Sequence, residues 1–480
     1  MYKSIQEFVE KGTQELEKSS QEFYEELNLD EWIKEIEDQV LQLGRNLIRE
    51  TLENLNELLR TSPDRKENWH IEHKSDVRSI VTSLGNVTYQ RSLFMHKKTK
   101  ERVYGVDEAI GLQKHVKVTR EVKAKILEEA TESSYRKGGE VLGFEKLSKT
   151  AVKDWIHELE VKVPVPEPTE KKQKKQLYIF ADEDHVSQQS SDPNTSGIFM
   201  PKLIVVAEGR ERENLRNKRY RLLGKRVFGG LASGVQSTEE LWDEVYRYIA
   251  LTYDESVLEQ VYINGDGASW IKKGLDVIEK SIFVLDKFHL SQSIHRSVSH
   301  LQEGQENMKN MLWEAVKKGD QQELHHLLDI VVEVTESSSK QEQIKSVQKY
   351  LRNQWKGIVN HNRYQKKLIG CCAEGQVSHI LSSRLSSRPL SWSRTGVDQM
   401  SKLCVYKANG GKIYDLLAMQ EKNQQQQQQI EKQNQWARRV RQESGAQQYA
   451  DVFTKMIPGI ERRQMHWLRD LTKHNYRISG

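Results

Sequence analysis

The length of 480 residues predicts about two to four domains, and a composition of 36% hydrophobic and 30% charged residues argues against wholesale disorder. The formal net charge of +5 is too small to establish nucleic-acid binding by itself, so local basic clusters matter more. Three cysteines without a CxxC pair argue against a disulfide framework or a cysteine zinc site, and no apolar run approaches the ~18 residues of a membrane span, so we expect a cytoplasmic protein.

Residues 1–62 are the first predicted region, and their pattern is helical. One stripe of apolar residues recurs at a spacing of three and four: Ile33, Ile36, Val40, Leu43 and Leu47. Such a stripe is typical of a helical pair that packs on its own domain. It also fits a coiled coil that joins two copies, although only about two or three heptads are regular.

Residues 63–160 form the second predicted region, which combines a β-hairpin with helices. The stretch 77–95 is rich in β-branched and aromatic residues, and the pair Gly85-Asn86 divides it into two runs. Glycine and asparagine tolerate the backbone conformations of tight turns, so this pair predicts the hairpin turn.

The segment LSKTAVKDWIHEL, at 147–159, is typical of the second helix of a helix-turn-helix, with Ser148 as its N-cap. The residues predicted to face outward and contact DNA are Lys149, Thr150 and Lys153. The residues predicted to pack inward are Val152, Trp155 and Ile156. An ordinary helical hairpin is the alternative, because helix-turn-helix patterns have low specificity.

A linker is predicted at 161–176, where three prolines at alternate positions favour extended backbone. Its lysines either keep a tether solvated or contact phosphates. From 177 to 410 the pattern is α+β or α/β: three strands, then helix, strand, helix, strand and helix. This is the order of an RNase H-like fold, in which the first three strands form an antiparallel meander.

A helical insertion is predicted within this catalytic domain at about 300–365, where apolar residues recur at helical spacing. Residues 411–480 form a C-terminal helical region with a glutamine run, Gln424 to Gln429. The glycine-rich segment 229–234 lacks the Lys-Ser/Thr of a phosphate-binding loop, which argues against a nucleotide cofactor.

Acidic residues follow two of the predicted strands. The first strand ends in Ala181-Asp182-Glu183-Asp184-His185, and Asp182 and Asp184 share one face by alternation. The fourth strand ends in Gly265-Asp266-Gly267. We expect the first and fourth strands to be neighbours, so that their aspartates lie together at the carboxyl edge of the sheet, where ligands bind.

A third acid is predicted on a helix beyond the insertion, and Glu374 fits this position best. Three carboxylates without cysteine ligands suit Mg²⁺, or Mn²⁺, and two ions would assist an in-line displacement at phosphorus. His185, His289 and His295 are alternative metal ligands, although polar core or DNA contacts are the commoner roles.

Several segments together resemble the signature blocks of the ISLre-type insertion-sequence transposases of bacteria: ADEDHV, NGDGASWIK, LDKFHL, CCAEGQVSHILSSRLSSRPLSWS and, before the core, SYRKGGEVLGF. The similarity covers nearly the whole chain. A more distant similarity is to Mutator-like transposases, through Asp286-Lys287-Phe288-His289.

The resemblance implies a DDE transposase that binds terminal inverted repeats, cleaves there and joins the ends to target DNA, as a homo-oligomer without a membrane role and associated with the nucleoid when on DNA. Its implied catalytic and metal-binding acids are Asp182 (with Asp184 as rival), Asp266 and Glu374, supported by Asp286, His289 and the packing of Trp270. Arg384, Arg388 and Trp392 are expected to contact phosphates and stack on bases. The alternatives are a catalytically inactive DNA-binding repressor and an RNase H-like nuclease or resolvase.

Overall fold

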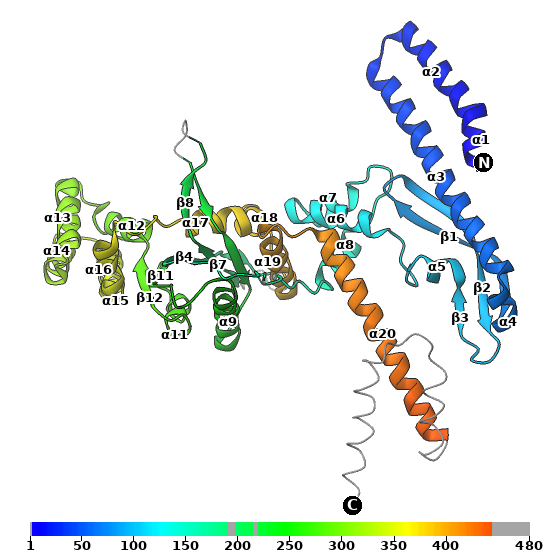
Figure 1. Cartoon of the computed structure of the whole chain (residues 1–480). Helices are drawn as coiled ribbons and strands as arrows, with labels where there is room; N and C mark the ends of the chain where they lie inside the picture. Colours follow the sequence, from blue (N-terminus) through cyan, green and yellow to red (C-terminus); the bar gives the residue numbers. More distant parts are fainter. Residues whose placement is uncertain (1, 167, 191–196, 215–218, 444–480) are drawn as a thin grey trace, which may run out of the picture. The chain divides into compact units, whose positions relative to one another are not determined.

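The computed structural model describes residues 2–166, 168–190, 197–214 and 219–443 (Figure 1). The chain divides into two compact units, Met1–Leu417 and Ala418–Gly480. Its elements mix helices with several separate sheets, so the predicted α+β class is confirmed.

The N-terminal region is a helical hairpin, as predicted. It consists of α1 (Lys3–Glu7), the π-helix η1 (Phe8–Gly12), α2 (Thr13–Glu26) and α3 (Leu29–Thr61). Leu27 turns the chain with a left-handed backbone, φ 52°, and the Asn28 side chain then caps α3 by accepting the Glu31 N–H. The two arms meet through the stacked rings of Phe23 and Trp32, 4.8 Å apart.

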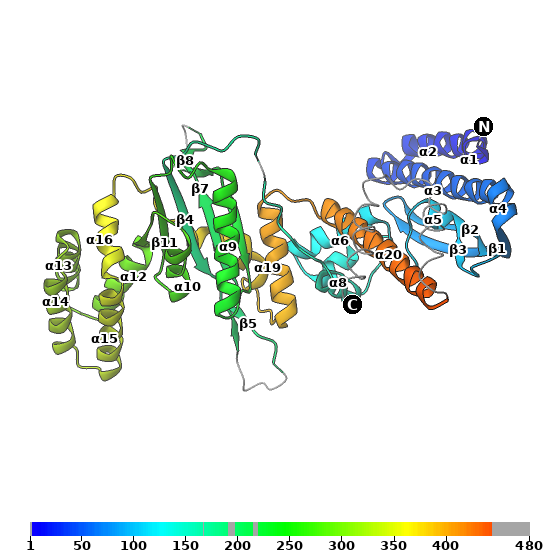
Figure 2. The same ribbon diagram turned by 60° about the horizontal axis from the view of Figure 1, so that its bottom comes forward.

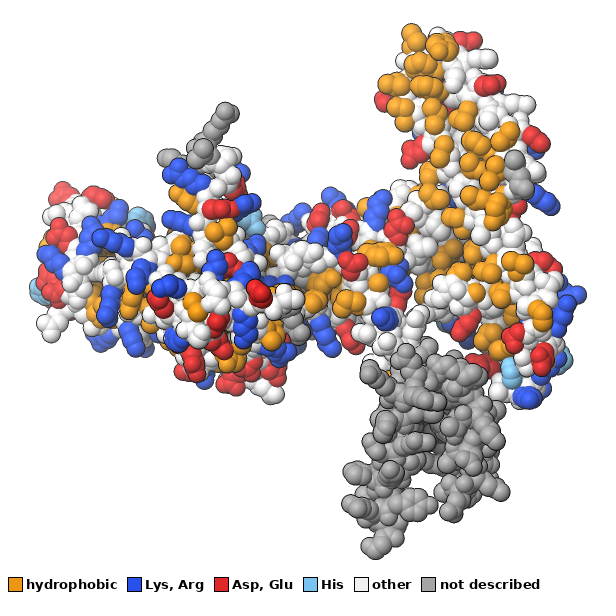
Figure 3. Space-filling model, in the orientation of Figure 1, with side chains coloured by type: hydrophobic (Ala, Val, Ile, Leu, Met, Phe, Trp, Pro, Cys, Tyr) orange, Lys and Arg blue, Asp and Glu red, His pale blue; other side chains and the backbone are white. Residues whose placement is uncertain are grey.

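Apolar side chains gather over the face of this hairpin that Figure 3 shows. Ile33 and Val40, in the predicted stripe, are 51% and 53% exposed. Among the described residues, the first buried hydrophobic side chain along the chain is Ile80. The hairpin therefore has no buried apolar core of its own.

The hairpin of strands is confirmed, but its turn was predicted at the wrong residues. β1 (Trp69–Thr82), β2 (Gly85–His96) and β3 (Arg102–Tyr104) form an antiparallel sheet in that order. Thr82 pairs with Gly85, so Ser83 and Leu84 make the turn and Gly85 begins β2 with φ +117°. The reason is local, because the Thr82 hydroxyl accepts the Leu84 N–H and donates to the Gly85 carbonyl.

A buried ion network holds this sheet to the short helix α5 (Gly105–Ala109). Asp107 is 6% exposed and accepts hydrogen bonds from Arg78 Nη1 at 2.6 Å and from the Tyr89 hydroxyl at 2.9 Å. Arg91 forms a further ion pair with the same carboxylate. The carboxylate thus pairs with the buried guanidinium of Arg78 and the half-buried guanidinium of Arg91 at once.

Three helices follow: α6 (Arg120–Glu132), α7 (Tyr135–Glu140) and α8 (Lys149–His157). Ser148 caps α8 as predicted, its hydroxyl accepting the Ala151 N–H at 3.1 Å. Val152 and Ile156 are fully buried, and Trp155 is half-buried. The predicted inward face of α8 is therefore confirmed.

The central sheet has the predicted neighbours. Its strands are β4 (Gln176–Glu183), β7 (Lys202–Ala207), β10 (Arg226–Gly230), β11 (Gln260–Gly265) and β12 (Ser281–Leu285). Their order is β10-β7-β4-β11-β12, with β4, β7 and β10 antiparallel and β4, β11 and β12 parallel. The first and fourth strands of the domain, β4 and β11, thus lie side by side. Two small hairpins were not predicted: β5 (Val186–Ser187) with β6 (Ile198–Phe199), and β8 (Gly209–Arg212) with β9 (Tyr220–Leu223).

Helices cover both faces of this sheet. On one face lies α9 (Val235–Thr252) (Figure 2), whose Trp242 belongs to the same apolar core as Ile179 and Ile263 of the sheet. On the other face, Tyr178 and Phe180 meet elements that follow the insertion. These elements are α17 (Ala373–Val377), the π-helix η2 (Ser378–Ser382), α18 (Ser383–Leu385) and α19 (Arg394–Ala408). Successive side chains of β4 point to opposite faces of the sheet, so β4 contributes residues to the apolar cores on both faces.

One edge of the sheet is closed by α19. The Asn409 side chain, just after this helix, donates to the Val227 carbonyl at 2.8 Å and accepts the Val227 N–H at 2.9 Å. The backbone N–H and carbonyl of Val227 are thus already hydrogen-bonded, so this edge strand has fewer free backbone groups with which a further strand could pair.

The predicted insertion is helical, which confirms that expectation. After α10 (Ser269–Lys272), α11 (Gly274–Val277) and α12 (Lys287–Val298) come α13 (Gln305–Lys318), α14 (Gln321–Glu333), α15 (Ser338–Asn353) and α16 (Trp355–Tyr364). The glutamine run lies within α20 (Ile413–Glu443), and the rest of the predicted C-terminal region, 444–480, lies outside the described residues. None of the described helices combines the length and apolarity needed to cross a membrane.

Candidate active site at the carboxyl ends of three parallel strands

Three aspartates stand at the carboxyl ends of three neighbouring parallel strands, Asp182 within β4 and Asp266 and Asp286 directly after β11 and β12. Phe180 of β4 pairs with Asn264 of β11, and two residues later the strands reach Asp182 and Asp266. Gly265 of β11 pairs with Leu285 of β12, and the next residues are Asp266 and Asp286. The strand register therefore forms a row of carboxylates, which we call the aspartate row: Asp182, Asp266 and Asp286.

Burial dominates the electrostatics of Asp182. The pKa of this carboxyl is raised from 3.8 to about 6, with burial as the largest cause and the nearby Asp266 as a smaller one, while the Glu183 N–H and His289 lower it. Asp182 therefore lies close enough to Asp266 and His289 for both side chains to affect its pKa. A carboxylate in such a place gains from a cation that compensates its lost hydration.

The loop of Asp266 is held by the helical insertion. The Tyr350 hydroxyl, on α15, donates to the Asp266 carbonyl at 2.6 Å, and Gln354 Nε2 donates to the Gly267 carbonyl at 3.1 Å. Within the loop, Asp266 Oδ1 accepts the Ala268 N–H at 2.9 Å. Gly267 has φ +90°, and a Cβ there would collide with the Gln354 amide. No motif pointed to Tyr350 or Gln354, because their importance arises only from the packing of distant segments.

Asp286 has a double role at the start of α12. Its Oδ1 accepts the Phe288 N–H at 3.0 Å as the N-cap, and its Oδ2 lies 3.9 Å from His289 Nε2. The half-buried Cys371 also hydrogen-bonds to Asp286 through its thiol, and burial followed by the charge of Asp286 raises the pKa of this thiol well above its usual value. The segment before Glu374 therefore reaches the aspartate row through Cys371.

Asp184 is the other candidate for the first acid. It is 7% exposed, and its two carboxylate oxygens accept a shared hydrogen bond from the Ser386 hydroxyl at 2.8 and 3.0 Å. Its Oδ1 also accepts the His185 N–H. These bonds occupy the carboxylate, whereas Asp182 stands in register with Asp266.

Glu183 is an acid to which the sequence patterns assigned no role. Burial raises its pKa, and the charge of Asp266 adds to this shift. Lys202, its partner across β4 and β7, donates to the Ala232 carbonyl at 2.6 Å and to the Thr238 hydroxyl at 2.7 Å. Its position between Asp182 and Asp184 could have drawn attention to Glu183. The alternation of side chains along β4, however, places it on the face of the sheet opposite to those two aspartates.

Glu374 lies on the same side of the sheet but apart from the row. Its helix, α17, packs on β4 and β7 through Ala373 and Val377, while Glu374 itself is exposed. Within the described ranges, no three His, Cys, Asp or Glu side chains are arranged to hold a metal ion. The expected triad is therefore only partly assembled: Asp182 and Asp266 stand in register, but neither Glu374 nor Asp286 completes a group of three with them.

The predicted DNA contacts divide into exposed and buried residues. Lys149 and Thr150 are exposed at the start of α8, and Lys153 is half-exposed and pairs with Asp154 at 2.9 Å. Arg388 is exposed, with Nη1 3.5 Å from the Ser133 carbonyl oxygen. These four residues keep cations or hydroxyls at the surface.

Trp392 and Arg384 are both buried, so base stacking by Trp392 was predicted wrongly, while the predicted phosphate contact of Arg384 stays a prediction. Trp392 is 5% exposed and donates from Nε1 to the Leu385 carbonyl at 2.9 Å, so its ring is part of the core and has no face for base stacking. Arg384 is also 5% exposed and donates from Nε to the Ala130 carbonyl at 2.8 Å. Both side chains are buried for the same reason, because the Arg384 guanidinium packs over the Trp392 indole, 4.7 Å from the ring centroid.

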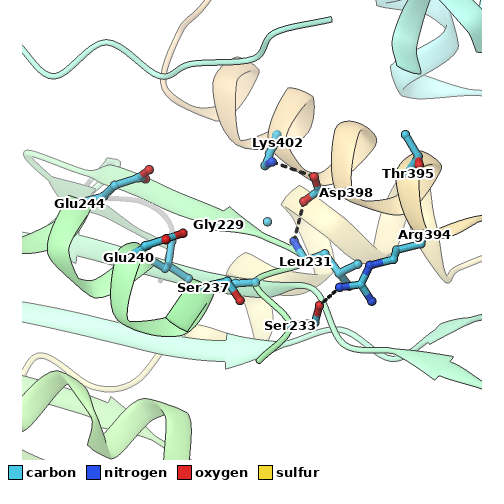
Figure 4. A pocket seen from close by; sticks show the side chains of 13 residues that line it. Gly229, Leu231, Ser233, Ser237, Glu240, Glu244, Arg394, Thr395, Asp398 and Lys402 are labelled. Carbon is cyan, nitrogen blue, oxygen red and sulfur yellow. Dashed lines mark hydrogen bonds and ion pairs between the residues drawn. The ribbon is translucent and has the colours of Figure 1, made fainter. Parts of the chain in front are cut away.

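A hollow of about 410 Å³ opens beside β10 and the start of α9 (Figure 4). Asp398 accepts hydrogen bonds there from the Leu231 N–H at 3.2 Å and from Lys402 at 2.7 Å. Glu240 and Glu244 add two more acids to its lining. Its charges are mixed and partly paired, so it does not favour an anionic ligand.

Comparison with known proteins identifies the family of the chain. A UPF0236 protein of Caldanaerobacter subterraneus subsp. tengcongensis is 36% identical over 398 residues, which cover 83% of this chain and 81% of the relative. A second UPF0236 protein of the same strain is 35% identical over 398 residues, with the same coverage. A Streptococcus gallolyticus relative, named a UPF0236 protein in the vanSb 3′ region, is 23% identical over 359 residues, 72% of this chain and 75% of its own. The model of the uncharacterised protein family UPF0236 matches residues 23–423, and the chain therefore belongs to this family.

Proposed function

We propose that the chain is the DDE transposase of a bacterial insertion sequence, which cuts DNA at terminal inverted repeats and joins the ends to a target. The observation that carries the proposal is the common register of Asp182 and Asp266 at the carboxyl ends of adjacent parallel strands. Paired carboxylates at this edge of a mixed sheet are suited to hold divalent cations against a phosphodiester.

The sheet supports the proposal through its order. Counted along the domain, the strands are arranged third, second, first, fourth and fifth, with the first three antiparallel and the last two parallel to the first. An RNase H-like core has its strands in this order, and phosphodiester chemistry with two metal ions is common on that fold, so the order supports the proposal. Fold alone does not assign function, so the proposal depends on the acids.

The donor set fits Mg²⁺ or Mn²⁺. Asp182 and Asp266 offer hard oxygen ligands, and the burial that raises the pKa of Asp182 to about 6 favours a cation beside it. We assign Glu374 as the third ligand on the resemblance of its segment. Two bound ions would activate a water or 3′-hydroxyl and stabilise the leaving oxygen.

The chain's own residues then position this chemistry. Tyr350 and Gln354 fix the loop that carries Asp266, and His289 lies near enough to Asp182 to lower its pKa. Asp286 holds His289 at the start of α12. Lys149 and Thr150 at the exposed start of α8 are the residues we assign to recognition of the repeats.

The names of the relatives favour a mobile element. The name of one Caldanaerobacter relative joins eleven gene designations of one strain, and the name of another joins four. Several genes for one protein in one strain are what transposition produces. This observation favours a transposase over a nuclease or resolvase with a single cellular task.

The test is a cleavage and strand-transfer assay on DNA that carries the inverted repeats flanking the gene. We expect Mg²⁺-dependent cleavage by the natural chain and at least a ~10³-fold loss in Asp182→Asn, Asp266→Asn and Glu374→Gln, since each loses charge needed in the transition state. Asp243→Asn, an exposed acid of α9, is the matched control.

Full activity in Asp266→Asn would refute the assignment of the acids. Specific binding of the repeats without cleavage by the natural chain would favour the repressor. Cleavage of branched DNA without preference for the repeats would favour a nuclease or resolvase.

A further inference from the structure

A cavity of about 380 Å³ lies away from the aspartate row, among α6, η2, α18, α19 and the residue before β10. Six of its lining residues bear on its chemistry: Thr131, Lys225, His379, Ser383, Arg384 and Lys407. The cavity therefore combines a side chain from the helices before the linker with side chains of the central domain.

Its charge is predominantly positive. Lys225, Arg384 and Lys407 contribute three cations, and Glu132 is the one acid of the lining. Glu132 is already paired with Lys407 at 2.8 Å. The Cys404 thiol, which also lines the cavity, stays neutral because burial raises its pKa to about 11. Two positive charges are thus left uncompensated by the lining.

Arg384 is the centre of this site. Its guanidinium lies against the rings of both Trp392 and Tyr135, 4.7 and 5.6 Å from their centroids. Nε donates to the Ala130 carbonyl, but the buried Nη1 has no hydrogen-bond partner, and Arg384 forms no ion pair with any residue that the structure describes. Burial lowers the pKa of this group, which shows that its charge is poorly compensated.

We propose that this cavity binds a phosphate group of the DNA backbone, with Arg384 as its buried donor and Lys225 and Ser383 at its exposed rim. A guanidinium is suited to phosphate oxygens because its N–H groups lie in one plane and remain charged. A backbone phosphate here would position the duplex without reading its sequence. The identity of the ligand as DNA rests on the proposed function, whereas phosphate binding at the cavity does not.

Inorganic phosphate is the first probe, measured by calorimetry and thermal unfolding on the full chain. We expect saturable binding to the natural chain and to the control Lys317→Gln, an exposed lysine of α13. Ser383→Asp places a negative charge at the rim, and Lys225→Gln removes a cation, so both should weaken phosphate binding at least tenfold. Both positions are exposed, and unfolding without phosphate checks that the variants fold.

Duplex DNA is the second probe, in an Asp266→Asn background so that binding is measured without cleavage. We expect Lys225→Gln to lower the slope of log K against log salt by about 1, as removal of one lysine–phosphate interaction should, while Lys317→Gln does not. Phosphate binding with an unchanged DNA slope would overturn DNA as the source. No phosphate binding, or equal binding to Ser383→Asp, would overturn the site itself.

A failure of the proposed function would look different from either result. The phosphate arm does not depend on catalysis, and the DNA arm uses a variant that lacks a catalytic acid. Loss of cleavage with intact phosphate binding would therefore leave this site standing.

Discussion

Asp182 and Asp266, separated by the whole meander and α9 along the chain, stand at one register position because Phe180 pairs with Asn264. Parallel pairing brings their carboxylates to the same edge, where burial and mutual repulsion raise the pKa of Asp182. The two acids therefore oppose folding for as long as no cation accompanies them.

The pH dependence of stability should report this cost. The folded-state pKa of Asp182, about 6, exceeds its usual 3.8, so between these pH values the folded chain binds more protons than the unfolded chain. This proton binding stabilises the folded chain, and the stabilisation is lost as the pH rises through 6. Asp182→Asn should therefore raise the free energy of unfolding at pH 7.5 by up to about 3 kcal/mol, a gain that shrinks toward pH 4.

Urea unfolding at several pH values measures this effect, and Mg²⁺ should stabilise the natural chain more than the variant. Asp243→Asn is the control, because that acid is exposed. A stability difference that does not change between pH 4 and 7.5 would contradict the raised pKa.

Gly267→Ala should damage the site through its backbone. Alanine at φ +90° is strained, and its Cβ would collide with the Gln354 amide, so the Asp266 loop has to move. We expect a loss of about 1–3 kcal/mol in stability and a large loss of cleavage.

Gly410→Ala is the matched control for that variant. It has φ +81°, but nothing lies within 4 Å of a Cβ there, so it adds backbone strain without a clash. The double variant Gly267→Ala, Gln354→Ala should regain part of the loss, since the colliding amide is gone. Equal damage from Gly410→Ala and Gly267→Ala would argue against the contact with Gln354.

Asp107→Ala should be among the most destabilising substitutions in the N-terminal part. It would leave the buried guanidinium of Arg78 without its ion pair and the Tyr89 hydroxyl without an acceptor. Breaking a buried ion pair in this way costs about 3–5 kcal/mol. Chemical denaturation measures the loss, and Asp107→Asn should recover part of it. A change below about 1 kcal/mol would mean that water reaches the network.

Lys149→Ala together with Lys153→Ala should weaken DNA binding and flatten its salt dependence, by about 1 in slope for each phosphate that the protein no longer neutralises. Lys149 should account for most of the effect, because Lys153 is already paired with Asp154. Binding titrations at several salt concentrations are the measurement, with Lys317→Ala as control. An unchanged slope would locate recognition elsewhere.

Ile33→Glu with Val40→Glu should disrupt self-association. Both side chains are half exposed on α3, and the hairpin buries no apolar core of its own, so a second copy is the partner we expect to cover the stripe. Light scattering should show a dimer or larger oligomer for the natural chain and a monomer for the variant. A natural chain that is monomeric at micromolar concentration would contradict this prediction.

The central sheet was predictable because its strands are apolar runs that end in acids or glycines, and the order of elements restricts the possible connections. Ser148 was predictable for a similar reason, since a cap is a local signal. Trp392 was not, because an aromatic residue beside arginines has the same appearance whether the pair is exposed or buried. The contacts of Tyr350 and Gln354 with the Asp266 loop were not predictable either, since they depend on how an insertion folds back.

The hydrogen bonds from Tyr350 of α15 and from Gln354, directly after it, to the Asp266 loop mean that the helical insertion supports the candidate site. Hydrogen bonds from Tyr350 and Gln354 reach the backbone of Asp266 and Gly267, so fraying of α15 would release the loop without touching any carboxylate. Cation binding at the aspartate row and the stability of α15 against local unfolding are then thermodynamically linked. Amide exchange in α15 should therefore slow when cations bind at the row.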